Sequence, residues 1–217
     1  YKRQKLPMYQ NSGKFMNKID LNNIIKLSNH IGNPHKNIKT VHVAGTNGKG
    51  STSSIIAKIL QNNGYKVGLY TSPHLINFNE RIRIDGIPIS DEKIIKFIES
   101  HKQTLIDSSI TFFEATTALA FEHFADQKVD IAIVETGLGG RLDSTNVLTP
   151  LQTIITEIHY DHTHILGESI EEITTEKCGI FKDKTPSITV NSDSRAIKTI
   201  KEQALLKNVE VSFIKKE

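Results

Sequence analysis

The sequence lacks the features that mark secreted and membrane-spanning proteins. It has one cysteine, Cys178, so no internal disulfide can form, and a single thiol is ordinary in a reducing compartment. It has no run of eighteen consecutive apolar residues, the length needed to cross a membrane. Its first residues, Tyr1 to Lys5, contain neither Met nor an apolar stretch typical of a signal sequence. We therefore expect a cytoplasmic protein that does not act at a membrane.

The chain also lacks a strong excess of either charge. Its 27 Lys and Arg residues and 24 Asp and Glu residues give a net charge of +3, and the basic residues are spread along the chain. This distribution does not indicate a nucleic-acid partner. With 37% hydrophobic residues, the 217-residue chain suits one soluble domain with a substantial core. A second complete domain would be crowded.

From Thr40 onward, short apolar runs rich in β-branched residues alternate with segments of helical periodicity. This alternation is typical of βαβ units around a parallel sheet. We expect strands at 40–44, 66–70, 129–135, 153–158, 186–191 and 209–214, and helices at 51–63, 91–105, 112–127, 169–178 and 194–207. The sequence predicts a doubly wound α/β fold with a mostly parallel sheet. In such folds ligands bind beyond the carboxyl ends of the strands.

Three of these helices carry more specific expectations. Thr111 with Glu114, and Ser169 with Glu172, have the spacing of a capping box at a helix start. In the helix at 51–63, four apolar residues are expected to share one face, namely Ile55, Ile56, Ile59 and Leu60.

A glycine-rich loop between the strand at 40–44 and the next helix predicts a phosphate site. Its glycines let backbone N–H groups approach phosphate oxygens, and the helix start adds partial positive charge. Lys49 can neutralise phosphate charge, and a hydroxyl from Ser51 or Thr52 can reach Mg²⁺. The expected ATP-binding residues are Gly45, Thr46, Asn47, Gly48, Lys49, Gly50, Ser51 and Thr52.

The loop departs from the standard G-x-x-x-x-G-K-[ST] pattern, because Gly50 follows Lys49 and Val43 stands where the first glycine would fall. A simple P-loop kinase therefore fits poorly. The plain alternative is a glycine-rich turn with an exposed lysine.

The segment GTNGKGS resembles the phosphate loop of the Mur ligase superfamily, whose members use ATP to join an amino acid to a carboxylate through an acyl phosphate. Other segments look like one branch, the dihydrofolate/folylpolyglutamate synthases. They are LPMYQNSGK, GNPHKNIKTVHVAGTNGKGS, TSPHLINFNERIRIDG, ETGLGGRLDSTN, DHTHILG and EEITTEKCGIFK. The resemblance implies an ATP- and Mg²⁺-dependent ligase that adds glutamate to dihydropteroate or reduced folates.

The resemblance implies that Ser72, Glu135 and His162 are magnesium ligands. Each is expected just after a strand, and a carboxylate, a hydroxyl and an imidazole make an acceptable shell for a hard divalent ion that keeps water and phosphate oxygens as its other ligands. Taken singly, each has a plain alternative: a Ser-Pro turn, a lysine partner and a structural histidine. A zinc cluster at His159, His162 and His164 would need a second group of ligands, which the sequence does not offer.

The resemblance also implies that Lys177 is catalytic and can be carbamylated, alongside Lys49 and His162. Carbamylation would replace an ammonium by a carboxylate that can approach Mg²⁺. Unmodified, Lys177 is expected to pair with Glu176 or to bond carbonyls at its helix end. We read Cys178 as a buried small residue rather than a nucleophile.

For the pterin-bearing substrate, the resemblance implies contacts from Thr111, Phe113 and Asp143. Phe113 could stack on the ring and Asp143 could accept its amino hydrogens. The alternatives are a helix cap for Thr111 and a core position for Phe113. Glu80 and Arg81 either order the loop after the Ser-Pro-His segment or form a surface ion pair.

Members of the branch are about twice this length, with glutamate bound between two domains. We therefore expect residues 1–217 to be an incomplete ATP-binding N-terminal domain, inactive alone, with the C-terminal glutamate-binding domain outside it and a monomeric full-length protein. Two rival functions stay open: another Mur-type ligase, such as one of cell-wall precursor synthesis, and a non-catalytic nucleotide-binding module.

Overall fold

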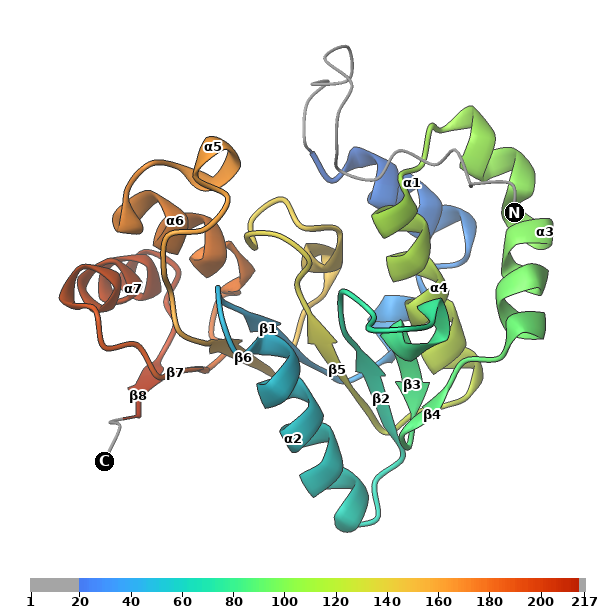
Figure 1. Ribbon diagram of the computed structural model, residues 1–217, viewed down its shortest axis with the longest axis horizontal. Coiled ribbons are helices and arrows are strands. Elements are labelled where there is room, and N and C mark those ends of the chain that lie inside the picture. Colours follow the sequence, from blue (N-terminus) through green and yellow to red (C-terminus); the bar gives the residue numbers. More distant parts are fainter. Residues whose placement is uncertain (1–19, 215–217) are drawn as a thin grey trace.

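The computed structural model describes residues 20–214, which form one eight-stranded sheet with helices on both faces (Figure 1). The strand order is β4-β3-β2-β5-β1-β6-β7-β8. The strands are β1 (Thr40–Ala44), β2 (Val67–Tyr70), β3 (Ile82–Ile84), β4 (Ile87–Pro88), β5 (Ile131–Glu135), β6 (Gln152–Ile155), β7 (Ser187–Thr189) and β8 (Val211–Phe213). All neighbours pair in parallel except β2–β3 and β3–β4, which confirms the predicted fold class.

Seven α-helices and four 3₁₀ helices flank the sheet within residues 20–214. The α-helices are α1 (Asn22–His30), α2 (Lys49–Asn62), α3 (Asp91–Asp107), α4 (Phe112–Asp126), α5 (Thr163–Leu166), α6 (Ile170–Lys177) and α7 (Ser194–Leu206). The 3₁₀ helices are η1 (Pro34–Asn37), η2 (Phe78–Arg81), η3 (Ser144–Val147) and η4 (Cys178–Ile180). In Figure 1, α2 crosses in front of the sheet, with α1, α3 and α4 to the upper right and α5, α6 and α7 to the upper left.

The alternating side chains of β1 show which helices pack on each face of the sheet. Val41 and Val43 pack in the cluster that contains Ala57 of α2. His42 and Ala44 point to the opposite face, because successive side chains of a strand alternate. There Ala44 packs with Ile173 of α6. The third cluster joins α1, α3 and α4 to β2 and β5.

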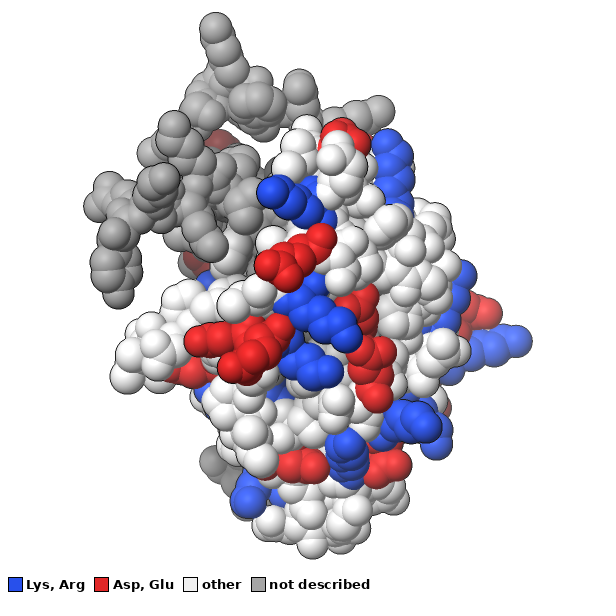
Figure 2. Space-filling view, turned by 90° about the vertical axis from the view of Figure 1, so that its right-hand side faces the viewer, with Lys and Arg blue, Asp and Glu red and all other residues white. Residues whose placement is uncertain are grey.

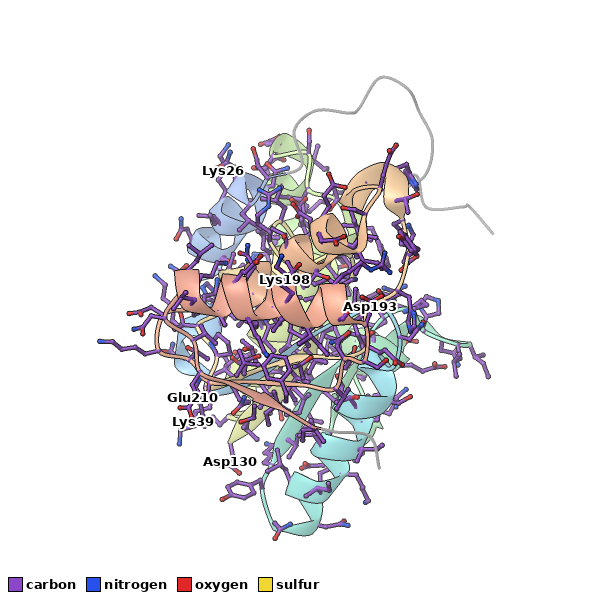
Figure 3. The ribbon with its side chains drawn as sticks, turned by 90° about the vertical axis from the view of Figure 1, so that its left-hand side faces the viewer. Lys26, Lys39, Asp130, Asp193, Lys198 and Glu210 are labelled. Atoms are coloured by element: carbon purple, nitrogen blue, oxygen red, sulfur yellow. The ribbon has the colours of Figure 1, made fainter. Side chains whose placement is uncertain are left out.

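The surface shows no single-sign patch on the side that Figure 2 displays, where positive and negative side chains are interspersed. Figure 3 looks onto α7, with Asp193 at its start and Lys198 along it. Asp193 caps this helix by accepting the N–H groups of Arg195 and Ala196. Within residues 20–214, every helix is too short or too polar to cross a bilayer.

The predicted apolar face of α2 is half wrong. Ile55 and Ile59 are 60% and 56% exposed, whereas Ser53 and Ala57 are buried. The helix starts at Lys49, and the stripe through Ser53, Ala57 and the partly buried Ile56 faces the sheet. Apolar periodicity alone therefore placed the buried face of α2 about one residue away from where it lies.

Candidate functional site

The carboxyl ends of three adjacent strands meet at the centre of the sheet. β1 lies between β5 and β6 and runs parallel to both. The segments that follow Ala44, Glu135 and Ile155 therefore start at the same end of the sheet. The chain passes from β1 to one side of the sheet and later returns to the other side. Such a switch point leaves a crevice between the diverging connections, which is where open α/β sheets bind ligands.

The predicted phosphate loop leaves β1 at this switch point in a sharply bent conformation. The N–H groups of Thr46 and Asn47 donate to the Glu157 carbonyl at 2.9 and 3.3 Å, which ties the loop to the segment after β6. Gly45 has φ +150°, and a Cβ there would lie 1.8 Å from Thr156 Oγ1. Gly48 has φ +82°, a left-handed conformation that favours glycine. The backbone therefore leaves no room for a side chain at Gly45 and favours glycine at Gly48.

Beyond this turn the loop stays open and positively polarised. Asn47, Gly48 and Ser51 are exposed. The first N–H groups of an α-helix have no carbonyl partner within the helix, and α2 starts at Lys49. The Lys49 ammonium bends back and donates to the carbonyls of Gly45 and Thr46 at 3.0 and 3.2 Å. The arrangement offers backbone donors and one ammonium to an anion.

Glu135 stands beside this loop, at the end of β5. It is 3% exposed, and its register partner on β1 is Val43. The Ser72 N–H donates to Glu135 Oε2 at 3.3 Å, and a Cβ added at Gly50 would lie 3.4 Å from the same oxygen. Burial raises the pKa of Glu135 to about 7, although the Lys49 ammonium opposes this rise. A carboxylate held in a desolvated position next to an anion site suits a bound cation.

His162 lies in the segment after β6, farther from its strand than expected. β6 ends at Ile155, and His162 precedes α5 with φ 46°. Its imidazole is half exposed, and Nε2 lies 3.5 Å from Asp161 Oδ1. Thr46 Oγ1 donates to the carbonyl of His159 at 3.1 Å, so this segment touches the phosphate loop. Within residues 20–214, the structure joins Ser72 to Glu135 and records no contact of His162 with either.

Lys177 reaches the phosphate loop from α6. It is 2% exposed, and its Nζ donates to the Gly45 carbonyl at 2.9 Å. Burial, with help from the nearby Lys49 ammonium, lowers the pKa of Lys177 to about 8. The expected pairing with Glu176, or with carbonyls of its own helix end, is wrong, because Glu176 pairs with Arg141 at 2.8 Å. Lys177 and Lys49 thus both donate to the Gly45 carbonyl of the phosphate loop.

Cys178, next to Lys177, behaves as a buried side chain. It is fully buried, and burial raises the pKa of its thiol to about 12. A thiol with so high a pKa carries almost no thiolate at neutral pH, so it is a poor nucleophile.

The three predicted substrate residues are largely occupied by structural contacts. Thr111 caps α4 in the expected capping box with Glu114. Phe113 is 6% exposed, and its ring fills the space where a Cβ of Gly137 would lie, 2.4 Å from Cζ. These observations favour the plain alternatives for Thr111 and Phe113. Their substrate roles stay predictions.

Asp143 is committed to its own loop rather than presented to a ligand. It is 2% exposed, and Oδ2 accepts the N–H groups of Gly137 and Leu138 at 2.8 and 2.9 Å. Oδ1 accepts the N–H and the hydroxyl of Thr145 at 3.0 and 2.5 Å. Four donors leave little capacity for pterin amino groups. The geometry corrects the expectation of an accessible acceptor.

The segment after Ser72 is ordered by the two residues singled out in the sequence. Glu80 accepts the N–H groups of Leu75, Ile76 and Asn77 at 2.9, 3.2 and 2.8 Å, and these bonds lower its pKa. Arg81 donates to His74 Nδ1 at 2.8 Å. The loop-ordering interpretation is therefore confirmed, and the surface ion pair is wrong.

The fold and the loop at its switch point define a Mur-type α/β domain. Residues 43–217 match the family described as the Mur ligase middle domain, which is more than half of the chain. The chain belongs to this Mur ligase family.

Within the family, its similarities are to folate ligases. The chain is 48% identical over 198 residues to the dihydrofolate synthase/folylpolyglutamate synthase of Bacillus subtilis and 42% identical over 179 residues to the folylpolyglutamate synthase of Lacticaseibacillus casei. These matches cover 88% and 79% of this chain, but 46% and 42% of the relatives. The chain thus spans about half the length of the curated relatives that it matches.

Solved structures agree. The FPGS-AMPPCP-folate complex superposes with a TM-score of 0.88 at 36% identity, over 96% of this chain and 51% of that chain. The folylpolyglutamate synthase of Thermotoga maritima gives a TM-score of 0.84 at 41% identity, over 90% of this chain and 46% of that chain. The predicted family resemblance is confirmed. The segment LPMYQNSGK lies outside the described residues.

Proposed function

We propose that this chain is the ATP-binding part of a ligase that adds L-glutamate to dihydropteroate, to reduced folates, or to both. The observation that carries the proposal is the open phosphate loop, with Lys49 above it and Glu135 beside it. The relatives named as folylpolyglutamate synthases, and the FPGS-AMPPCP-folate complex among the structural neighbours, support ATP and a folate as substrates. No observation favours the cell-wall ligase or the non-catalytic module.

In the proposed reaction the substrate carboxylate attacks the γ-phosphate of ATP, ADP leaves, and an acyl phosphate forms. The amine of glutamate then attacks the acyl carbon and phosphate leaves. Lys49 and the loop N–H groups stabilise charge on the transferring phosphoryl group. Because no protein nucleophile is needed, the chain's task is to hold and orient the reactants.

A magnesium ion fits the residues around Glu135. The buried Glu135 carboxylate has a raised pKa and lies within reach of the phosphate loop, and Ser72 adjoins it. Oxygen donors of this kind suit Mg²⁺, with phosphate oxygens and water completing its shell. We propose Glu135 and the Ser72 hydroxyl as ligands, with His162 as a third. When bound, the ion would neutralise phosphate charge.

Lys177 fits the proposed carbamylation. Its pKa of about 8 leaves a fraction of neutral amine at neutral pH. The amine lone pair attacks CO₂, an N–C bond forms, and one proton is released, which leaves a carbamate with one negative charge. That product would no longer repel a cation near Glu135. It should appear as a carbamate carbon signal in the ¹³C NMR spectrum after addition of ¹³C-bicarbonate, and Lys177→Met should lack it.

The ligase function is tested with the full-length gene product, ATP and glutamate, with phosphate release measured for dihydropteroate, for tetrahydrofolate and for a UDP-linked muramyl peptide. We expect release with at least one pterin substrate and none with the peptide. Lys49→Ala should reduce it by roughly a hundredfold or more, while Lys58→Ala, an exposed lysine on the same helix, should not. Release that depends on the peptide alone, or full activity of Lys49→Ala, would refute the proposal.

A further inference from the structure

A buried histidine on the central strand is not used by the proposed chemistry. His42 lies in the middle of β1 and is fully buried. Its Nε2 lies 2.8 Å from the hydroxyl of Thr145, which is also fully buried. Burial, with a smaller contribution from Lys182, lowers the pKa of His42 to about 3. The imidazole is therefore neutral at physiological pH.

The direction of this hydrogen bond follows from a proton count. Thr145 Oγ1 lies 2.5 Å from Asp143 Oδ1 as well as 2.8 Å from His42 Nε2. Burial raises the pKa of Asp143, but its two oxygens accept three backbone N–H groups, which favours the ionised carboxylate. A hydroxyl has one proton and this carboxylate has none, so Thr145 donates to Asp143. The Thr145 oxygen must then accept from His42, which fixes the proton of the imidazole on Nε2. The two hydrogen bonds therefore run in one direction, from His42 on β1 to Thr145 and from Thr145 to the Asp143 carboxylate.

The far end of this hydrogen-bond chain organises the loop that follows Glu135. Through its other oxygen, Asp143 accepts the N–H groups of Gly137 and Leu138. The Thr136 N–H is anchored to β1 by the Val43 carbonyl at 2.9 Å. Loop 136–143 is thus fixed to the central strand twice, once by the main chain and once through His42.

We propose that His42 is a positioning residue for the active site: by donating through Thr145 to Asp143, it sets the geometry of loop 136–143 and so of the groups on either side of it. The loop starts directly after Glu135. At its other end Arg141 N–H donates to the Glu176 carbonyl at 2.8 Å, one residue before Lys177. Its consequence for ligation rests on the proposed function, but the hydrogen-bond chain does not.

Two substitutions of His42 differ in where they place a donor. The amide nitrogen of glutamine reaches as far as Nε2 of histidine, whereas that of asparagine reaches only as far as Nδ1. His42→Gln should therefore keep the bond to Thr145, and His42→Asn should lose it. Thr40→Val is the matched control, because Thr40 Oγ1 is an equally buried atom of the same strand with no hydrogen-bond partner among the described residues.

The test measures amide hydrogen exchange at Gly137 and Leu138 in the full-length protein, without nucleotide or substrate, so that it stands apart from the ligase assay. We expect exchange to be roughly tenfold faster in His42→Asn than in wild type, and restored in His42→Gln. Thr40→Val should leave it unchanged. Equal exchange in wild type and His42→Asn, or equal acceleration in all three variants, would overturn the proposal.

The wild-type protein provides a second test that no folding defect can obscure. In protein labelled with ¹⁵N-histidine, the ring nitrogens of His42 should show a protonated Nε2 and a bare Nδ1. A neutral ring protonated on Nδ1 would reverse the direction of the bond to Thr145 and overturn the assignment, and a charged ring at pH 7 would contradict the neutral state of His42.

Discussion

Two glycine-rich loops follow neighbouring strands of the sheet and use their backbones in opposite ways. In the loop after β1, Asn47 and Gly48 are exposed, and the start of α2 offers unpaired donors. In the loop after β5, Gly137 and Leu138 already donate to the buried Asp143. The first loop is open to a ligand, and the second is closed on itself.

The loop after β1 is therefore suited to bind a ligand, and the loop after β5 is suited to support the site. The open loop leaves the N–H groups at the start of α2 for phosphate oxygens, so a substitution there should mainly affect nucleotide binding. A closed loop has satisfied its donors within the fold, so a substitution there should mainly affect stability. Both loops adjoin the two buried ionisable groups: Glu135 precedes the closed loop and lies beside Gly50, and Lys177 donates to the Gly45 carbonyl of the open loop.

The largest effect is expected from a methyl group in the closed loop. In Gly140→Ala the new Cβ would lie 2.5 Å from the Lys177 carbonyl and 2.8 Å from the Glu176 carbonyl, and backbone atoms cannot move aside easily. We expect a loss of about 4 kcal/mol in the free energy of unfolding, measured with urea. In Gly48→Ala of the open loop the Cβ meets nothing within 4 Å. Its left-handed backbone should cost only about 1–2 kcal/mol. Equal losses in the two variants would show that the two loops are equally constrained.

A slightly smaller effect is expected for Glu135→Gln, and its sign depends on pH. The folded pKa is about 7 against 4.5 for the free group, so wild type loses stability as pH rises from 4.5 to 7. This interval of about 2.5 pH units corresponds to roughly 3 kcal/mol. We expect Glu135→Gln to be more stable than wild type by that amount at pH 8 and equal to it at pH 4, while losing Mg²⁺-dependent nucleotide binding.

Glu202→Gln is the control for this profile, since the Glu202 side chain is exposed and pairs with Lys198 at the surface at 3.9 Å. It should match wild type at both pH values. A Glu135→Gln protein that is less stable than wild type at pH 8 would show that the Glu135 carboxylate stabilises the fold even without a bound cation.

Lys177 gives the converse dependence, with a smaller effect over the accessible range. Its folded pKa of about 8 lies below the usual 10.5, so wild type loses stability as pH falls through this interval. In CO₂-free buffer, we expect Lys177→Met to gain about 2 kcal/mol relative to wild type between pH 9.5 and pH 7. Lys198→Met, at an exposed position on α7, should show no such gain. A flat Lys177 profile would mean that the amine is not desolvated.

The smallest effect is expected where the closed loop meets solvent. Arg141 pairs with Glu176 at 2.8 Å, but its side chain is 54% exposed. Arg141→Ala should therefore cost less than about 1 kcal/mol in unfolding experiments. A loss as large as that of Gly140→Ala would place the anchoring of the loop in the ion pair rather than in backbone packing.

Much of the fold and the open loop could be predicted from the sequence, because local signals agree there with the global fold. The capping boxes at Thr111 and Ser169 both formed. The missed hairpin of β3 and β4 also had a signal, since Asp85 and Gly86 carry the positive φ angles of an Asp-Gly turn between apolar residues. The missed helix α1 had a signal too, since Ile24, Leu27 and Ile31 recur at helical spacing and pack in one cluster.

The closed loop could not be predicted in the same way, since its contacts join residues far apart in the chain. His42 is a single polar residue in a buried strand, and nothing local shows that it faces Thr145, 103 positions later. The Lys177 amine likewise bonds a carbonyl 132 positions earlier. The order of the strands in the sheet decides which of these residues meet. The family resemblance therefore suggested an accessible Asp143, although the fold encloses it.

We propose that the open loop, and not the closed one, receives the triphosphate. The most direct test records ¹H–¹⁵N spectra of the full-length protein during titration with Mg²⁺ and AMPPCP. We expect saturable shifts of the amide signals of residues 45–52, with Gly137 and Leu138 changing far less. An unmoved phosphate loop, or shifts confined to residues 136–143, would contradict the account.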